Sequence, residues 1–144
     1  LELGNPKNIH PFLKKEVGLR LSRLALHDVY GFKNVIRSGP LFKSVQFDKE
    51  KALVHFDEIA KGLKAHSGEK LQGFVIAGID KKFVLAQAVI NKDGKSISVY
   101  ADGVKNPVAI RYAWANNPEE ANLINMEGLP ASPFRTDDWK LFDK

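Results

Sequence analysis

His10 is the residue of this sequence best placed to do acid–base chemistry. It lies in an Asn-Ile-His-Pro stretch directly before a predicted helix. A histidine held in a loop at that point can project its ring into a cleft, where an imidazole can accept and donate a proton near neutral pH. Such a base also needs an acid that orients its ring. Spacing alone leaves a helix-capping or simply exposed histidine as the alternative.

The other residues that could take part in chemistry do not form a second candidate site. His27 falls within the predicted helix, His55 within a predicted strand and His66 near a turn, without the spacing of a zinc site. No serine sits in a Gly-x-Ser-x-Gly elbow, and no glycine-rich phosphate loop is present. The sequence has no cysteine, which excludes disulfides and thiolate metal sites. We therefore expect no cofactor, no metal and at most half of an acid–base site.

One helix is predicted over residues 10–30, starting just after His10. Pro11 suits the first helical position, where its missing N–H costs nothing. The apolar residues of this segment recur at three- and four-residue steps and form one stripe: Leu13, Val17, Leu21 and Leu24. Gly31 suits the end of the helix. Without a partner for the stripe, we expect exposed apolar surface here and self-association through residues 10–30.

After the helix the pattern changes to short β segments. Six strands separated by polar turns are predicted, at residues 41–47, 52–56, 73–77, 83–90, 96–100 and 108–115. This spacing favours an antiparallel β-sandwich or jelly roll. In the last strand, alternation predicts that Val108, Ile110, Tyr112 and Trp114 share one buried face, while Arg111 points the other way.

The tail, residues 116–144, reads as an ordered extended segment. Pro130 and Pro133 rule out a regular helix there. Three aromatic residues, Phe134, Trp139 and Phe142, are predicted to anchor the tail by apolar burial.

Composition narrows the class of protein. The chain has 144 residues, of which 44% are hydrophobic and 27% charged, a soluble globular balance. The net charge is +5, but the lysines are dispersed among acids, so we do not expect a nucleic-acid binder. No apolar run approaches the roughly 20 residues of a membrane helix. The chain starts without methionine, as if partway through an element, and we expect it to be a fragment of a longer protein.

An ordered series of motifs resembles the sialate O-acetylesterases, serine esterases of the SGNH (GDSL-like) hydrolase superfamily. The matching segments cover nearly the whole chain: residues 5–11 (NPKNIHP), 15–18 (KEVG) with 20–21 (RL), 38–42 (SGPLF), 73–78 (GFVIAG) with Asp80, 104–115 (VKNPVAIRYAWA), 122–123 (NL) and 127–139 (EGLPASPFRTDDW). A single Ile-His-Pro would be weak evidence. The ordered series is stronger, and residues 104–115 are its most specific part.

The resemblance implies a division of the chain. Residues 1–36 would be the last catalytic block and C-terminal helix of an α/β hydrolase domain, and residues 37–144 a β-sandwich domain. His10 matches the catalytic histidine of the family, whereas the serine and the oxyanion-hole donors belong to earlier blocks. Many superfamily members carry an aspartate three residues before this histidine, where Lys7 stands here. Glu2 is the one carboxylate upstream, so the acid partner of His10 is not identified.

The resemblance also implies a substrate and partners. The intact enzyme would remove O-acetyl groups from sialic acid or related sugars, and the fragment alone would be inactive. Arg135 would bind the carboxylate of a sialic acid and Trp114 would stack on a sugar ring, with tail anchoring and core packing as their alternatives. The partners would be the acetylated sugar and the rest of the hydrolase domain, in a secreted or periplasmic protein. The alternative function is a non-catalytic β-sandwich module that binds carbohydrate or packs against another domain.

Overall fold

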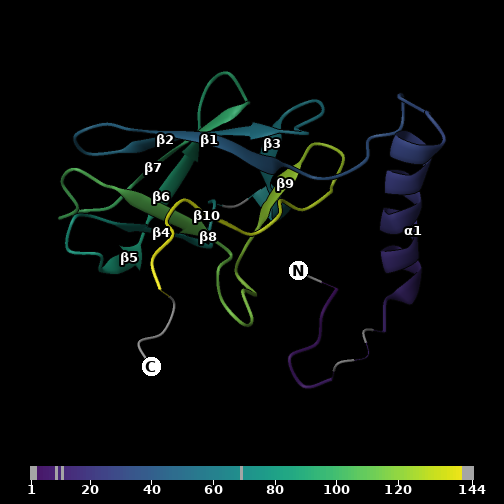
Figure 1. Cartoon of the computed structure of the whole chain (residues 1–144), viewed down its shortest axis with the longest axis horizontal. Coiled ribbons are helices and arrows are strands. Elements are labelled where there is room, and N and C mark those ends of the chain that lie inside the picture. Colours follow the sequence, from purple (N-terminus) through teal and green to yellow (C-terminus); the bar gives the residue numbers. More distant parts are fainter. Residues whose placement is uncertain (1–2, 9, 11, 69, 141–144) are drawn as a thin grey trace.

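Two four-stranded antiparallel sheets pack against each other, and one helix stands beside them (Figure 1). The computed structural model describes residues 3–8, 10, 12–68 and 70–140. The buried side chains of both sheets meet in one apolar cluster between them. The expected β-sandwich preceded by a helix is confirmed.

The first sheet has the strand order β1-β2-β7-β6. These strands are β1 (Leu41–Phe47), β2 (Ala52–Asp57), β7 (Ser96–Tyr100) and β6 (Gln87–Ile90). Strand β2 shows why the segment forms a strand. Its alternate residues Ala52, Val54 and Phe56 are buried, while the residues between them are partly exposed, as expected for a pleated strand with one face on the core.

The second sheet has the order β10-β8-β4-β5, and a further pair of strands closes one end of the sandwich. Its strands are β10 (Phe134–Arg135), β8 (Ala109–Tyr112), β4 (Phe74–Ala77) and β5 (Phe83–Leu85), and the additional pair is β3 (Leu63–Ala65) with β9 (Leu123–Asn125). A short 3₁₀ turn, η2 (His66–Gly68), follows β3. The sequence did not predict β3, β9 or β10, each of which has three residues or fewer.

Phe134 confirms the expectation that the tail is anchored by burial. Its ring stacks on Phe42 at a centroid distance of 4.7 Å and contacts Phe56 of the same sheet edge-on at 5.8 Å. It also lies 5.9 Å from Tyr112 in the second sheet. A single tail residue therefore ties both sheets together. Trp139 contacts Phe83 at 5.5 Å, and Phe142 lies outside the described residues.

The helix is shorter at its start than predicted. Helix α1 (Lys14–Leu24) continues into a π-helical turn, η1 (Ala25–Val29), and Gly31 ends it with φ at +76°. The predicted start just after His10 is wrong, because α1 begins at Lys14, and Pro11 lies outside the described residues. The backbone N–H of His10 is bonded instead to the Asn8 side chain, 2.9 Å away. Such a local bond holds the chain in a turn that competes with the helix.

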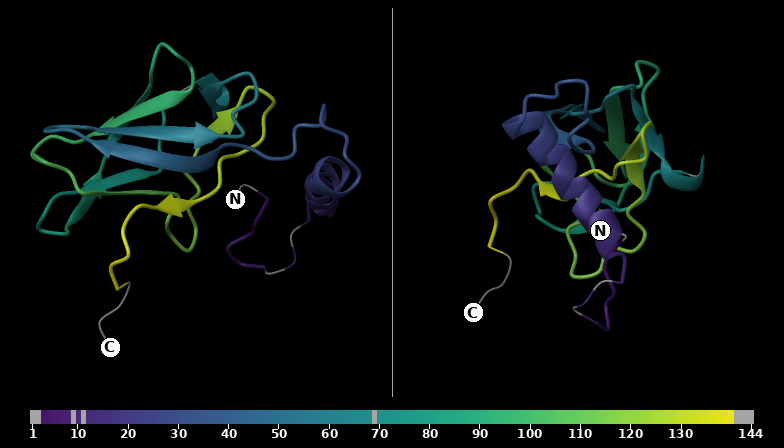
Figure 2. Two further views of the ribbon diagram at one scale, coloured as in Figure 1. Left: turned by 45° about the horizontal axis from the view of Figure 1, so that its top comes forward. Right: turned by 90° about the vertical axis from the view of Figure 1, so that its right-hand side faces the viewer.

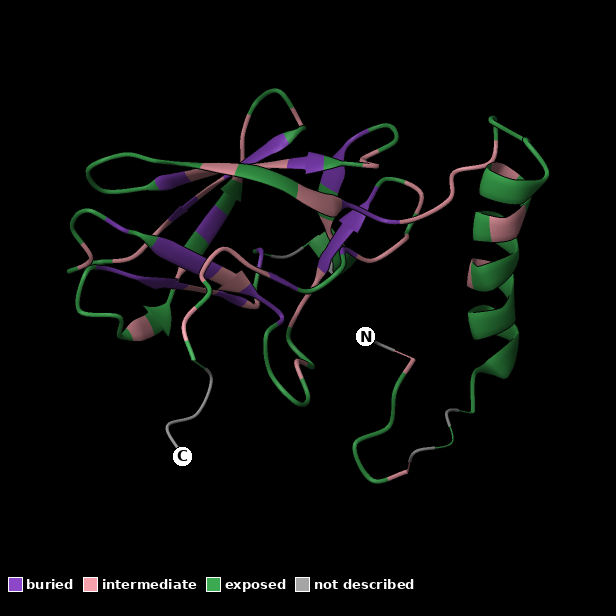
Figure 3. Ribbon diagram, in the orientation of Figure 1, coloured by how far each residue is buried: buried purple, intermediate pink, exposed green. Residues whose placement is uncertain are grey.

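Helix α1 is not covered by the sandwich. None of its residues is buried, and Figure 3 shows it almost entirely exposed. The predicted apolar stripe is open to solvent, with exposed fractions of 52% for Leu13, 36% for Val17, 62% for Leu21 and 39% for Leu24. Figure 2 shows the helix beside one end of the sandwich from two further directions. The exposed apolar surface that the sequence predicted is therefore present.

Two strand predictions need correction. The predicted strand 83–90 is interrupted at Ala86, whose N–H bonds to the Phe74 carbonyl oxygen at 3.0 Å. Because β5 and β6 belong to different sheets, the chain changes sheet at this residue. In the segment 108–115, Ile110 and Tyr112 are buried as predicted, but Val108 and Trp114 are each 43% exposed.

Candidate functional site

His10 lies in a loop built by two asparagine side chains. The backbone N–H of Lys7 donates to Asn5 Oδ1 at 2.8 Å, and that of His10 donates to Asn8 Oδ1 at 2.9 Å. These side-chain bonds fix local turns, as is typical of asparagine. They leave the His10 side chain exposed, four positions before α1 begins. An exposed imidazole at this point is open to a reaction partner supplied by another segment.

No described carboxylate lies within ion-pair distance of His10. Lys7, at the position where the resemblance described above would place an aspartate, is exposed. Glu2 lies outside the described residues. The acid that would orient the imidazole is therefore not provided by residues 3–8, 10, 12–68 or 70–140.

A second histidine does meet a carboxylate, at the far end of the helix. His27 Nδ1 lies 2.7 Å from Asp28 Oδ1, and Arg37 donates to the same oxygen at 3.0 Å. The hydrogen bond with His27, and then that with Arg37, hold the pKa of Asp28 below its usual value. Arg37 also lies 3.2 Å from Glu58. This exposed cluster joins the end of the helix to the sandwich.

Trp114 and Arg135 come together at the surface of the second sheet. The Arg135 guanidinium lies over the Trp114 ring, 5.5 Å from its centroid. Arg135 Nη1 donates to the Trp139 carbonyl oxygen at 3.1 Å, so it also ties the tail as one of the two interpretations predicted. The prediction that the Trp114 side chain packs in the core is wrong. Ala113 adopts φ +51°, which breaks the alternation and turns the next side chain outward.

Arg111 lies next to this pair but has a partner of its own. Its Nε donates to Asp137 at 2.8 Å and its Nη2 to the other carboxylate oxygen at 2.6 Å. The Asp137 side chain is 1% exposed. Arg111 also stacks on Phe83, with its Cζ 4.1 Å from the ring centroid. The sequence had placed Arg111 only on the face opposite the core, and no local pattern showed its partner 26 positions away.

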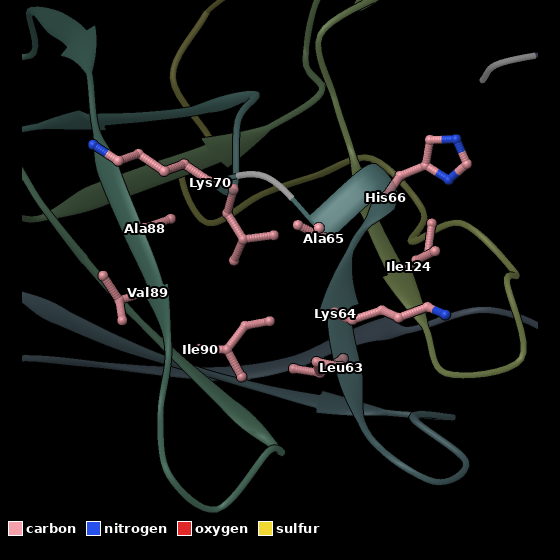
Figure 4. A pocket seen from close by; sticks show the side chains of 11 residues that line it. Leu63, Lys64, Ala65, His66, Lys70, Ala88, Val89, Ile90 and Ile124 are labelled. Atoms are coloured by element: carbon pink, nitrogen blue, oxygen red, sulfur yellow. The ribbon is translucent and has the colours of Figure 1, made fainter.

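A groove of about 660 Å³ lies elsewhere, between β6 and β3 (Figure 4). Its floor is aliphatic, including Leu63, Leu71 and Ala88. Lys64 and Lys70 stand at its edges, and His66 follows β3. None of the described residues forms a group of three potential metal ligands.

The chain is similar to one part of a carbohydrate acetylesterase. That protein is XAC1771 from Xanthomonas citri, whose crystal structure is described as that of a novel carbohydrate acetylesterase. The two share 46% sequence identity, with a TM-score of 0.91 over 96% of this chain. The chain spans 31% of the length of XAC1771. No protein-family model matches the chain, and a search of curated proteins found no match.

The similarity to XAC1771 extends beyond the sandwich. Residues 1–36 make up a quarter of the 144 residues. Superposing the sandwich alone could not give a TM-score of 0.91 over 96% of the chain. The helix is therefore part of the common structure, and its position beside the sandwich is shared with XAC1771.

None of the described helices is long and apolar enough to cross a bilayer.

Proposed function

We propose that this chain is the C-terminal part of a carbohydrate O-acetylesterase and that it supplies the catalytic histidine, His10. The observation that carries the proposal is the 46% identity over 96% of the chain to an acetylesterase about three times as long. The serine nucleophile and the oxyanion-hole donors would lie in the remaining part of the longer polypeptide. Residues 1–36 would then complete its hydrolase domain, and residues 37–144 would form the β-sandwich domain.

The exposed helix supports this division of the chain. A stripe of four aliphatic residues on one helix normally packs against another element, since burial of apolar side chains stabilises helices in proteins. Here the sandwich leaves the stripe open. A crevice of about 270 Å³ lies between α1 and the segment 129–133. We infer that the missing partner is the rest of the hydrolase domain, which would cover the stripe and place its serine near His10.

In this reaction His10 would move protons. It would accept the proton of the serine hydroxyl as the serine oxygen attacks the acetyl carbonyl, and would return it to the sugar oxygen as the acetyl–sugar bond breaks. Water would then attack the acetyl-enzyme while His10 accepts its proton, and His10 would pass that proton to the serine oxygen as the acetyl–serine bond breaks, which releases acetate and the free serine. The loop asparagines Asn5 and Asn8 would hold the His10 backbone in place at the helix entrance.

The substrate is proposed at two levels of detail. An acetylated carbohydrate is supported by the printed description of XAC1771. The finer proposal is an O-acetylated sialic acid handled by an SGNH-type enzyme in a secreted or periplasmic location, and it rests on the motif series that ends in residues 127–139. In that proposal Trp114 and Arg135 contact the sugar.

The test uses the longer polypeptide that contains this chain. His10→Ala should lower kcat for acetate release from an acetylated sugar by at least about 10³-fold, since removing the base of a serine hydrolase removes covalent catalysis. His66→Ala, at an exposed site after β3, is the matched control and should leave kcat unchanged. A His10→Ala enzyme that keeps its activity would contradict the proposal. Comparing an O-acetylated sialic acid with an acetylated neutral sugar tests the finer substrate assignment.

The second candidate function is carbohydrate binding without catalysis. It is favoured by one observation, the exposed Trp114 beside a guanidinium. In that case His10→Ala would be silent in the longer protein, while substitutions at Trp114 would weaken sugar binding.

A further inference from the structure

A gap separates two strand edges of the sandwich, where the groove of Figure 4 runs. Strand β6 is the edge strand of the first sheet, and β3 pairs only with β9. The gap closes at both ends. At one end the Leu63 N–H donates to the Gly94 carbonyl oxygen at 2.9 Å, and at the other Leu71 forms an isolated antiparallel bridge with Ala88. Between these ends no backbone hydrogen bond joins the described residues 63–65 of β3 to the described residues 87–90 of β6.

The outer edge of β3 presents backbone groups to this gap. In an antiparallel pair, residues that bond to the partner strand alternate with residues whose N–H and C=O point away from it. The His66 N–H donates to the Asn122 carbonyl oxygen at 2.8 Å, and the Gly62 carbonyl oxygen accepts from Met126 at 2.9 Å. Residues 62 and 66 therefore face β9. Ala65, next to the second of them, directs its N–H and C=O into the gap.

The edge of β6 does the same from the opposite side. The Asn91 N–H donates to the Ser96 carbonyl oxygen at 2.9 Å, which places residue 91 among those that bond toward β7. By the same alternation, the N–H and C=O of Ile90 point away from β7 and into the gap. Ala88, two positions earlier, also points away from β7, and its bridge to Leu71 confirms this direction. Two strand edges thus face one gap with backbone groups available for pairing.

The gap combines an aliphatic floor with a positive rim. Leu63 and Leu71 are buried in its floor. Lys64 and Lys70 are exposed at its edges, and no described carboxylate lies within ion-pair distance of either. None of the 11 lining residues is acidic, and Glu69 lies outside the described residues. An occupant with aliphatic side chains on one face and acidic side chains on the other would match both features.

We propose that this gap binds an extended acidic segment of another protein, which adds as a strand between β6 and β3. Its backbone bonds to Ala65 on one side and to Ile90 on the other, because an unpaired strand edge is a template for a further strand. Successive side chains of a strand point to opposite faces. Aliphatic side chains of the segment rest on the floor, and the acidic side chains between them face Lys64 and Lys70.

The charge of the chain favours a separate acidic protein over a second copy as the occupant. The net charge is +5, so a second copy that approaches this positive rim is repelled, whereas an acidic segment is attracted. The site consists of residues of the sandwich alone. It therefore does not depend on the esterase assignment, and His10 has no part in it.

The test is a titration of this chain with blocked peptides, followed by its backbone amide resonances in NMR spectra. The first peptide alternates glutamate and valine, the second alternates lysine and valine, and the third is the glutamate peptide with a methyl group on every backbone nitrogen. The glutamate peptide should slow hydrogen exchange of the Ala65 and Ile90 amides and shift them saturably, with a Kd on the order of 100 µM. The lysine peptide, which meets like charge, and the methylated peptide, which lacks N–H donors, should each bind at least about tenfold more weakly.

A matched pair of double variants tests the rim. Lys64→Glu with Lys70→Glu should weaken binding of the glutamate peptide by at least about tenfold and make the lysine peptide the tighter ligand. Lys49→Glu with Lys51→Glu makes the same change in net charge in the turn between β1 and β2, and should alter either affinity by less than about threefold. All four lysines are exposed, and the dispersion of the amide resonances verifies that each variant is folded.

Each of the other outcomes would overturn the proposal. Equal binding of the three peptides, shifts that spare Ala65 and Ile90, or equal effects of the two double variants would contradict the site. Protection of the two amides that rises with chain concentration alone would identify a second copy as the occupant. Protection of the same amides in the longer polypeptide without any peptide would identify the rest of that polypeptide. None of these results bears on the catalytic role of His10, which activity of the His10→Ala enzyme tests separately.

Discussion

Asp137 is a carboxylate almost completely removed from solvent, and its partner is Arg111. The exposed fractions of the two side chains are 1% and 16%, and two parallel hydrogen bonds join them. Asp137→Asn should leave Arg111 partly buried without an anion and lower the free energy of unfolding by about 2–4 kcal/mol. Urea unfolding monitored by Trp139 fluorescence measures this. Asp138→Asn, at the exposed neighbouring carboxylate, should stay within about 0.5 kcal/mol of the parent.

The same pair makes stability depend on pH. The hydrogen bonds from Arg111 hold the pKa of Asp137 below its ordinary value of 3.8. A carboxyl group with a lower pKa in the folded state adds stability above the unfolded pKa, and this stability is lost as the pH falls through the folded value. The difference in unfolding free energy between the parent and Asp137→Asn should be constant near neutral pH and shrink below pH about 4. A difference that does not change with pH would contradict this account.

At the residue scale, the sequence was better at identifying single residues of interest than at identifying the residues that they contact. It identified His10, Trp114 and Arg135 as residues of interest, but alternation alone placed Trp114 in the core. The left-handed backbone at Ala113 overrides that alternation, and alanine gives no sign of it in the sequence. The acid opposite Arg111 lies in the tail, so no local spacing could reveal it.

At the element scale, the segment that joins the helix to β1 packs its backbone directly on the tail. A Cβ at Gly39 would lie 2.6 Å from the Leu129 carbonyl oxygen and would also clash with Pro130. Gly39→Ala should therefore destabilise the sandwich by more than about 2 kcal/mol, since backbone atoms on both sides cannot rotate away. Thermal unfolding followed by circular dichroism tests this.

Gly18→Ala is the matched control for that substitution. No atom lies within 4 Å of a Cβ built at Gly18, which sits inside α1. Alanine there should stabilise the helix by about 0.5–1 kcal/mol, because glycine loses more backbone entropy in a helix. Equal effects at the two glycines would contradict the tight packing at Gly39.

The longer elements were predictable because their periodicity survives in the fold. The predicted strands 41–47 and 96–100 agree with β1 and β7 to the residue. Strands β3, β9 and β10 are too short to show a period, and they form only because the tail returns to the sandwich. The change of sheet at Ala86 was also hidden, since the mostly apolar run from Phe83 to Ile90 continues across it. Pairing with strands that are distant in the sequence decides where these elements form. A local sequence pattern carries no sign of that pairing.

At the scale of the whole molecule, the chain has two unequal parts. The sandwich has a closed apolar core with Phe134 at its centre. The helix contributes no buried residue and meets the sandwich through the exposed cluster of Asp28, Arg37 and Glu58. Exposed ion pairs of this kind contribute little to stability. Because the sandwich leaves the apolar stripe of α1 open, we expect the stripe to contact another partner.

For the isolated chain, the partner at hand is a second copy. We expect concentration-dependent self-association through the stripe, because joining two such faces removes apolar surface from water. Leu21→Lys places a charge in the middle of the stripe and should shift the chain toward monomer in sedimentation velocity at a matched concentration. Leu85→Lys is the control: Leu85 is 82% exposed on β5, more than the 62% of Leu21, but lies on an edge strand outside the stripe. If Leu85→Lys abolished association while Leu21→Lys did not, a strand edge would be the contact and the helix face would be excluded.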